Sequence, residues 1–267
     1  MIKTDLHVHT SYCDGKSSPE EIVLCAVSRG MSVLGFSGHS YTFFDENYCM
    51  SREGTQKYKA EISSLKEKYK GKIKILCGIE QDFYSEESTE GYDYVIGSVH
   101  YIRMPRGKKV SGCPEFGDYT YIPIDESAEI TRAAAEEYFG GDIYALAEKY
   151  FETEAQIIDR TGADIIGHFD LLTKFIEKDP YLDVNNPRYE AAWEKAADRL
   201  LKTGKVFEIN TGAISRGYRT SPYPSLKIQD YIIEKGGKFI MSSDSHYKDT
   251  LMFKFEEFKR ESYLKEI

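Results

Sequence analysis

Short apolar runs alternate with longer segments of helical period along most of the chain. Seven runs have the length and the β-branched and aromatic content of buried strands, and they cover residues 4–9, 32–37, 72–80, 92–100, 163–169, 205–210 and 238–243. Helical periodicity covers residues 53–69, 142–161, 188–203, 225–235 and 253–265. A further helix is predicted to begin after Ser18, because Pro19 and Glu21 complete a capping box with a proline at the first helical position.

Strands that are separated by helices predict parallel β-α-β units with right-handed crossovers. Seven such strands in 267 residues favour a closed or nearly closed α/β barrel, and a doubly wound open sheet is the alternative. The connections 40–54 and 101–126 are long for a compact domain, and loops of that length often form a lid or a substrate wall. The chain contains no internal repeat or linker, so we expect residues 1–267 to form a single domain.

Composition narrows the class of protein. A net charge of −9 does not suit a binding surface for nucleic acid or anionic membrane, so neither partner is expected. The first residues do not resemble a signal peptide and no apolar run approaches the length of a membrane span, which predicts a cytoplasmic protein. Five widely spaced cysteines without a CxxC pair argue against a disulfide scaffold and a cysteine-type zinc site.

Histidines follow the predicted strands in an unusual pattern. All six lie at or just beyond the carboxyl end of a strand, the third strand ends in Glu80, and Asp244 follows the last strand. In a barrel of parallel strands these ends share one rim, where barrel enzymes carry their active sites. The six residues are His7, His9, His39, His100, His168 and His246.

The spacing of His7 and His9 places both side chains on one face of a strand. A single His-x-His pair is weak evidence for a metal site, and a lone histidine at a strand end is more often structural. Six histidines on one rim with acidic neighbours favour a metal centre instead. Imidazole and carboxylate ligands without thiolate are typical of zinc, iron or manganese.

Several motifs resemble the polymerase and histidinol phosphatase (PHP) superfamily, and within it the monofunctional histidinol-phosphatases. They are DLHVHT at 5–10, GH at 38–39, GIE at 78–80, GSVHYI at 97–102, GDYTYIPID at 117–125, IIGHFDLLTKF at 165–175, FEINTG at 207–212 and SDSH at 243–246. The resemblance implies a distorted seven-stranded (β/α)7 TIM-like barrel with three divalent metal ions. The implied activity is metal-dependent hydrolysis of L-histidinol phosphate, a small phosphomonoester, in histidine biosynthesis.

The resemblance also implies a division of ligands among three metals. The first metal would be held by His7, His9, Glu80 and Asp244, and the second by the bridging Glu80 with His100 and His168. Asp14, His39 and His246 would hold the third. We assign catalytic roles to Glu80, Asp244 and His246, with Asp244 or a water as the general acid.

Basic residues in the same loops are candidates for binding the phosphate group. The resemblance places such residues in the loops that contain Lys174 and Arg216. Because the alcohol part of the substrate is cationic, acidic and aromatic side chains are expected nearby, and the candidates are Tyr41, Phe43, Asp45 and Tyr101. The alternatives are a PHP phosphoesterase for another phosphomonoester, a phosphotyrosyl protein or a nucleic-acid end, and a non-catalytic metal-binding scaffold. Oligomeric state is not predicted.

Overall fold

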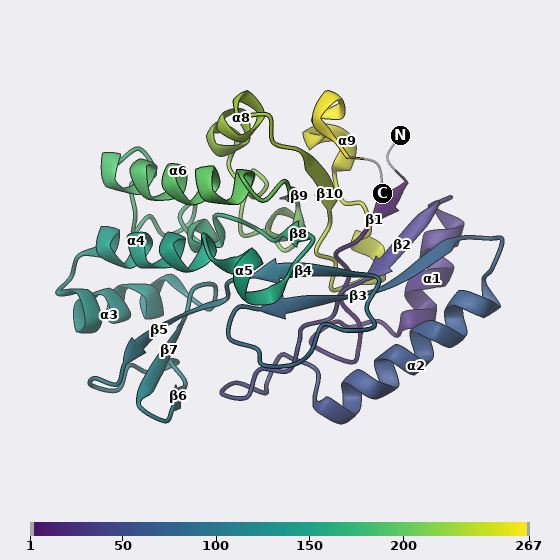
Figure 1. Cartoon of the computed structure of the whole chain (residues 1–267), viewed down its shortest axis with the longest axis horizontal. Helices are drawn as coiled ribbons and strands as arrows, with labels where there is room; N and C mark the ends of the chain where they lie inside the picture. Colours follow the sequence, from purple (N-terminus) through teal and green to yellow (C-terminus); the bar gives the residue numbers. More distant parts are fainter. Residues whose placement is uncertain (1–2, 266–267) are drawn as a thin grey trace.

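A seven-stranded parallel sheet forms the centre of the molecule (Figure 1). The computed structural model describes residues 3–265. The strand order is β1-β2-β3-β4-β8-β9-β10, so each strand of this sheet pairs with the next one along the chain. The strands are β1 (Thr4–Asp5), β2 (Val33–Phe36), β3 (Lys74–Asp82), β4 (Tyr94–Ser98), β8 (Ile165–Ile166), β9 (Val206–Asn210) and β10 (Phe239–Ser242).

Backbone contacts beyond β1 and β10 bring the two edges of the sheet together. Val8 forms a parallel bridge with Ser245, the His9 N–H donates to the Ser245 carbonyl at 2.9 Å, and the Ser245 N–H donates to the His7 carbonyl at 3.1 Å. Together with the curvature of a twisted sheet, these contacts produce a nearly closed barrel. The predicted barrel class is confirmed, and the open-sheet alternative is wrong.

Helices follow the predicted segments closely where caps define their ends. The Ser18 side chain accepts from the Glu21 N–H and Glu21 caps in return, which confirms the predicted capping box. Figure 1 shows α1 and α2 at the purple-to-blue side of the sheet, and α4 and α6 at its green side. The helices in these predicted segments are α1 (Pro19–Ser28), α2 (Arg52–Lys68), α4 (Ile143–Glu154), α5 (Ile157–Thr161), α6 (Pro187–Leu201) and α8 (Leu226–Glu234). The predicted helix 142–161 is therefore two helices, α4 and α5.

The connection 101–126 is not an open loop, which corrects the sequence prediction. It forms a three-stranded antiparallel sheet of β5 (Tyr101–Pro105), β7 (Tyr119–Pro123) and β6 (Glu115–Phe116). Its strands are rich in tyrosine, isoleucine and threonine, which suit a pleated surface, and Gly117 has the positive φ of 57° that the tight turn between β6 and β7 requires. Helix α3 (Ala128–Phe139), capped by Ser127, follows and is absent from the predicted helices.

The predicted closing helix over 253–265 is also wrong. Only α9 (Phe255–Phe258) and one 3₁₀ turn form in that segment. Another short helix, α7 (Gly212–Ser215), lies earlier in the chain. Asp5 accepts from the Met252 N–H at 2.9 Å, and the Lys265 N–H donates to the Phe239 carbonyl at 2.8 Å. These tertiary hydrogen bonds fix both ends of the segment, and Met252 and Lys254 have positive φ values of 52° and 55°, which a right-handed helix does not allow.

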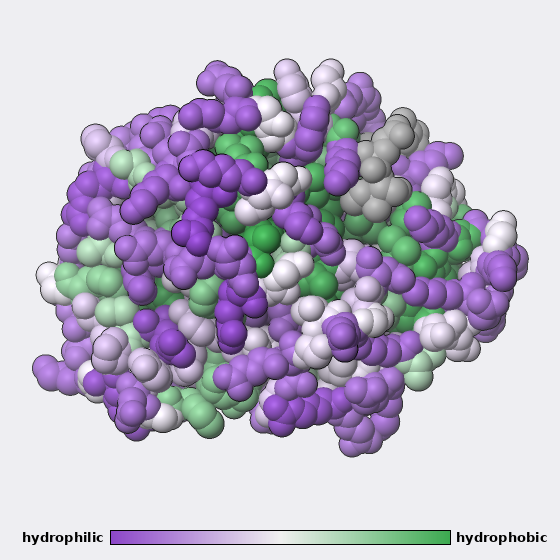
Figure 2. All heavy atoms as spheres, viewed as in Figure 1, coloured by the Kyte–Doolittle hydropathy of each residue, from purple (hydrophilic) through white to green (hydrophobic). Residues whose placement is uncertain are grey.

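The surface is mixed in polarity. Figure 2 shows polar side chains over most of one face, with apolar side chains in smaller separate areas, as expected for a folded domain. Within residues 3–265, no helix has the length and apolar character needed to cross a membrane.

Candidate metal centre

The rim at the carboxyl ends of the strands gathers all six histidines. His7 and His9 follow β1, His39 follows β2, and the remaining three follow β4, β8 and β10. Adjacent imidazole rings along this rim lie close together, with His9 and His246 stacked at 4.1 Å between ring centroids. The fold therefore brings the six histidines together at one rim, as their positions at the strand ends predicted.

Glu80, near the end of β3, lies at the centre of this group and is 1% exposed. Its Oε1 atom lies 2.9 Å from His168 Nε2 and 3.3 Å from His100 Nε2. Its Oε2 atom lies within 3.5 Å of a ring nitrogen of each of His7, His9 and His39. One carboxylate thus faces two different sets of imidazoles, one set at each oxygen.

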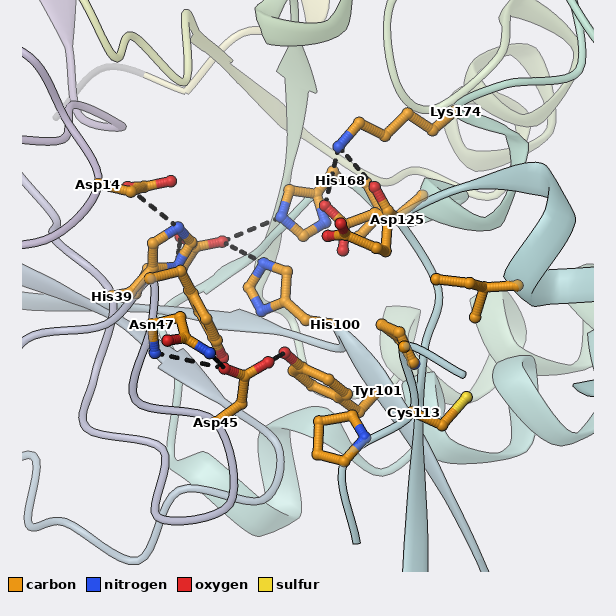
Figure 3. A pocket seen from close by; sticks show the side chains of 18 of the residues that line it. Asp14, His39, Asp45, Asn47, His100, Tyr101, Cys113, Asp125, His168 and Lys174 are labelled. Atoms are coloured by element: carbon orange, nitrogen blue, oxygen red, sulfur yellow. Dashed lines mark hydrogen bonds and ion pairs between the residues drawn. The ribbon is translucent and has the colours of Figure 1, made fainter. Parts of the chain in front are cut away.

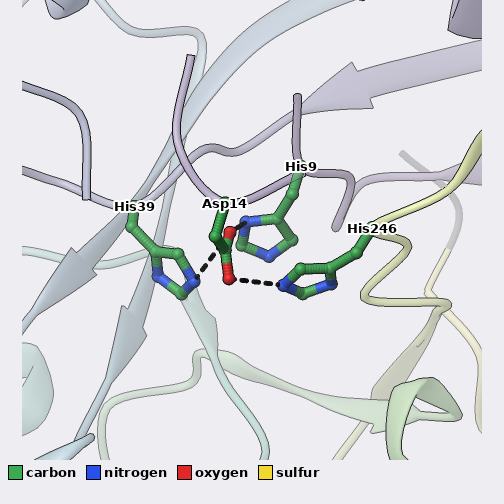
Figure 4. A group of neighbouring side chains, drawn as sticks. All are labelled: His9, Asp14, His39 and His246. Atoms are coloured by element: carbon green, nitrogen blue, oxygen red, sulfur yellow. Dashed lines mark hydrogen bonds and ion pairs between the residues drawn. The ribbon is translucent and has the colours of Figure 1, made fainter. Parts of the chain in front are cut away.

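Asp14 lies among the imidazole rings of His9, His39 and His246 (Figure 4). Its Oδ2 lies 3.1 Å from His246 Nε2, and its Oδ1 lies 3.7 Å from both His9 Nδ1 and His39 Nε2. Asp14 comes from the loop between β1 and α1, and Gly15 beside it packs so tightly on the His9–Thr10 backbone that a Cβ there would lie 2.6 Å from the Thr10 nitrogen. A glycine is therefore needed to bring this loop onto the rim.

Asp244 completes the rim after β10. It has φ of 47°, a left-handed conformation that is costly for a residue with a Cβ and is often found at functional sites. Its Oδ1 lies 3.1 Å from His9 Nε2, while its Oδ2 accepts from Arg216 Nη2 at 2.9 Å. Gly212 allows this approach, because a Cβ there would lie 2.6 Å from Asp244 Oδ2.

The site is charged although it is buried. Burial alone would raise the pKa of Glu80, but the neighbouring imidazoles outweigh it and hold the pKa of Glu80 well below its usual range. The same competition lowers the pKa of Asp14, with His39 and His246 opposing burial. Burial, reinforced by His246 and His39, lowers the pKa of His9 to about 3, so this imidazole is neutral at physiological pH and can act as a ligand.

Unpaired polar atoms support metal binding by these residues. Within residues 3–265, buried atoms without a hydrogen-bond partner include His7 Nε2, His9 Nε2, Asp14 Oδ1 and Glu80 Oε2. Such atoms are costly in a folded protein unless a ligand satisfies them. All four belong to the predicted ligand set and point into the rim, so the residues present fit divalent cations.

Ligand atoms within 4.8 Å of one another form three groups. They are His7, His9 and Glu80; His39, Glu80 and His100; and His9, Asp14, His39 and His246. His9 and His39 each belong to two groups, whereas the sequence-based assignment used each histidine once. Seven of the nine predicted ligands belong to these groups. The other two lie next to them, with His168 Nε2 at 2.9 Å from Glu80 Oε1 and Asp244 Oδ1 at 3.1 Å from His9 Nε2. The division among individual ions stays a prediction.

Glu208 on β9 is an important residue that the sequence-based search did not identify. It is fully buried, and its Oε2 lies 2.9 Å from His7 Nδ1. Its Oε1 accepts from the His168 N–H at 2.6 Å and from Asn210 Nδ2 at 2.8 Å. Because a carboxylate only accepts, His7 carries its proton on Nδ1 and presents Nε2 to the rim. The signal in the sequence is a single acidic residue inside the apolar strand KVFEIN.

Asp82 performs the same function for His100. Its Oδ2 lies 3.2 Å from His100 Nδ1, and its Oδ1 accepts from the Tyr84 N–H at 2.7 Å. Strand β3 continues two residues past its predicted end at Glu80, which places Asp82 on the same face as Glu80. That i, i+2 spacing of acidic residues was the available signal.

A cavity of about 750 Å³ opens onto the rim (Figure 3). Both predicted phosphate-binding residues, Lys174 and Arg216, line it. Lys174 Nζ pairs with Asp125 Oδ2 at 3.0 Å, and Arg216 Nη1 donates to the Asp244 carbonyl at 2.8 Å. Burial would raise the pKa of Asp125, but Lys174 and His100 lower it to about 2.

The predicted acidic and aromatic wall is present in part. Asp45 and Tyr101 line the cavity, as do Tyr48 and Phe44 from the same walls. Tyr41 and Phe43 do not line it; Tyr41 donates to the exposed Glu46 instead. This arrangement joins an end of the cavity lined by histidines, Lys174 and Arg216 to an end lined by Asp45 and aromatic rings.

Comparisons with known proteins agree with this architecture. A PHP domain family model matches residues 5–212. A relative named "Probable histidinol-phosphatase" from Deinococcus radiodurans is 28% identical, and the match covers 96% of this chain and 91% of the relative.

Two crystal structures share the fold. The hisK protein of Listeria monocytogenes superposes with a TM-score of 0.76 at 20% identity, covering 96% of this chain and all of that one. Histidinol phosphate phosphatase from Lactococcus lactis, solved with zinc, L-histidinol and phosphate, superposes with a TM-score of 0.63 at 18% identity, covering 92% of this chain and 87% of that one.

Proposed function

The chain belongs to the PHP domain family, and we propose that it is a histidinol-phosphatase, a phosphoric monoester hydrolase that converts L-histidinol phosphate to L-histidinol and phosphate. The observation that carries the proposal is the two-sided environment of Glu80. Its two oxygens face separate sets of imidazoles, as expected for a carboxylate shared by two metals. Near-full-length relatives named for this activity support the choice of substrate.

Nine side chains would hold the metals, which we propose to be three divalent ions of zinc, iron or manganese. The donor set of imidazoles and carboxylates suits these ions. Bound metals would supply a water of lowered pKa and positive charge opposite the phosphate oxygens. The ligands are His7, His9, Asp14, His39, Glu80, His100, His168, Asp244 and His246.

Residues around the metal ligands set their protonation. Glu208 holds the Nδ1 proton of His7, and Asp82 does the same for His100, so each ring directs its other nitrogen at Glu80. Burial would raise the pKa of Asp244, but Arg216 and His7 hold it well below its usual range. An ionised Asp244 suits a ligand or proton acceptor better than a general acid.

Lys174 and Arg216 would receive the phosphate group. Both are largely buried cations on the cavity wall next to the histidine rim. Each is held by a carboxylate, Asp125 or Asp244, which fixes the position of the charge before substrate arrives. Fixed donors of this kind stabilise the charge that develops on phosphoryl oxygens.

The direct test is phosphate release by the metal-loaded protein from L-histidinol phosphate and from a panel of other monoesters and diesters. A kcat/KM for histidinol phosphate at least about a hundredfold above that for generic esters supports the proposal. Equal turnover of generic monoesters would reject the substrate while leaving the hydrolytic chemistry, and no turnover of any ester would reject the enzyme class.

A further inference from the structure

One carboxylate that lines the cavity is held in position by hydrogen bonds and, within residues 3–265, has no cation paired with it. Besides the acids among the histidines of the rim, three acids line the cavity, namely Asp45, Asp125 and Glu126. Asp125 is already neutralised by Lys174 at 3.0 Å. For Asp45, no lysine, arginine or histidine within residues 3–265 forms an ion pair with its carboxylate.

Hydrogen bonds hold the Asp45 side chain in place. Its Oδ2 accepts from the Tyr101 hydroxyl at 2.8 Å, and its Oδ1 accepts from Asn47 Nδ2 at 2.9 Å (Figure 3). Burial, together with Asp45, raises the pKa of Tyr101, so the phenol keeps the proton that it donates. The Asn47 backbone N–H also donates to Oδ1, at 3.3 Å, so Oδ2 is the oxygen that keeps a lone pair for a further donor. Glu126, by contrast, is exposed, and within the described residues no side chain fixes its position.

Aromatic rings connect Asp45 to the histidine rim. The Tyr48 ring lies 4.8 Å from the His39 ring and 6.2 Å from the Tyr101 ring, which carries the hydroxyl bonded to Asp45. The rings of Tyr101 and Tyr48 therefore connect Asp45 to His39, a ligand of the proposed centre. A small ester whose phosphate lies at the rim extends over a comparable length.

Contacts between aromatic rings join the connection 40–54, which carries Asp45, to the antiparallel sheet β5-β7-β6. Phe44 stacks on Tyr121 of β7 with ring centroids 3.6 Å apart, and Phe44 also meets the Tyr101 ring edge-on at 4.9 Å. The connection 40–54 and the antiparallel sheet β5-β7-β6 thus form one continuous aromatic surface. Rigid aromatic contacts lower the entropy lost when a ligand is ordered against the wall.

We propose that Asp45, held by Tyr101 and Asn47, is the specificity-determining residue that pairs with the cationic nitrogen of the leaving alcohol while the phosphate lies at the histidine rim. This inference rests on the proposed function, because it requires a substrate with an anionic phosphate at one end and a cationic nitrogen at the other. A partly buried, positioned carboxylate that lacks a cation favours such a substrate and gives a neutral ester no comparable contact.

The test compares kcat/KM for L-histidinol phosphate with kcat/KM for p-nitrophenyl phosphate, whose leaving group has no cationic nitrogen. The wild type, Asp45→Asn and the control Glu46→Gln are measured with the same metal loading. Glu46 is the matched control, since it is an exposed neighbour on the same loop, bonded to Tyr41 and outside the cavity lining. Asp45→Asn should lower the ratio of the two constants about ten- to a hundredfold, and Glu46→Gln should leave it within about twofold.

An unchanged ratio in folded Asp45→Asn, or an equal fall in Glu46→Gln, would overturn the assignment. Tyr101→Phe keeps the test available if Asp45→Asn does not fold, because it removes only the hydroxyl that positions Asp45. A fall of about threefold or more in the ratio is expected, and no change in Tyr101→Phe would again overturn the assignment. A wild-type protein with no preference for histidinol phosphate would instead reject the proposed substrate, so the two failures are distinguishable.

Discussion

Glu208→Gln is the most informative change near the metal centre, because it alters one buried charge without changing the shape of the side chain. The glutamine can keep its oxygen toward the His168 N–H and Asn210 Nδ2, the two groups that donate to Oε1 in the wild type. Its amide NH₂ then faces His7 Nδ1 in place of Oε2. Two donors would meet there, unless the His7 proton moves to Nε2, the atom 3.2 Å from Glu80.

The expected magnitude follows from that tautomer change. A proton on Nε2 prevents His7 from acting as a ligand through the atom that faces the rim. Removing a carboxylate that orients a ligand histidine typically weakens metal binding ten- to a hundredfold, which corresponds to about 1.4–2.8 kcal/mol. Glu208→Ala would be less informative, since it also leaves buried donors unpaired at about 1–3 kcal/mol each.

Metal affinity is measured by competition with a chromogenic chelator, starting from metal-free protein. Thermal unfolding of the metal-free variant shows whether the fold is intact, and ¹⁵N chemical shifts of histidine report the tautomer of His7. Glu67→Gln on the exposed face of α2 is the control for loss of one negative charge. If folded Glu208→Gln binds metal as tightly as the wild type, then Glu208 does not position His7 for ligation.

Two further changes test the barrel closure and the phosphate end of the cavity. Asp5→Ala should destabilise the protein by about 3 kcal/mol or more, because buried Asp5 accepts from the Ser243 and Met252 N–H groups; urea unfolding that changes by less than about 1 kcal/mol would contradict this role. Lys174→Met should raise KM for the phosphate ester and weaken inhibition by inorganic phosphate about tenfold, and unchanged values for both would exclude Lys174 from phosphate binding. The same variant should raise the pKa of Asp125, which Lys174 lowers to about 2. Ionised Asp125 stabilises the wild type above about pH 4 and loses this contribution as the pH falls toward 2, so the stability profile of the variant should be flatter over that interval.

Features that depend on strand ends were predictable from the sequence. A histidine after an apolar run can be located without knowing the partner strand, because parallel strands share a rim, and this placed His7, His39 and His246 together correctly. Glu208 could not be assigned in this way, since its contact with His7 spans 201 positions of the chain. An acidic residue in a strand shows that a partner exists without identifying the partner.

Segments whose structure depends on tertiary contacts were predicted less well. The helical period of 253–265 is real, but Asp5 holds the Met252 N–H and Phe239 holds the Lys265 N–H, so the segment follows the barrel edge. The antiparallel sheet within 101–126 was missed because its strands were assigned to a long connection. This sheet forms part of the wall that carries Tyr101, so the missed element is also the one that shapes the substrate end of the cavity.

The most direct test of the shared metal centre is Glu80→Ala, measured as metal ions per chain together with phosphate release from L-histidinol phosphate. Glu80 faces both sets of imidazoles, so its loss should lower metal content by about two ions per chain and reduce turnover by at least about a thousandfold. Near-normal metal content and activity in the folded variant would contradict a centre bridged by Glu80.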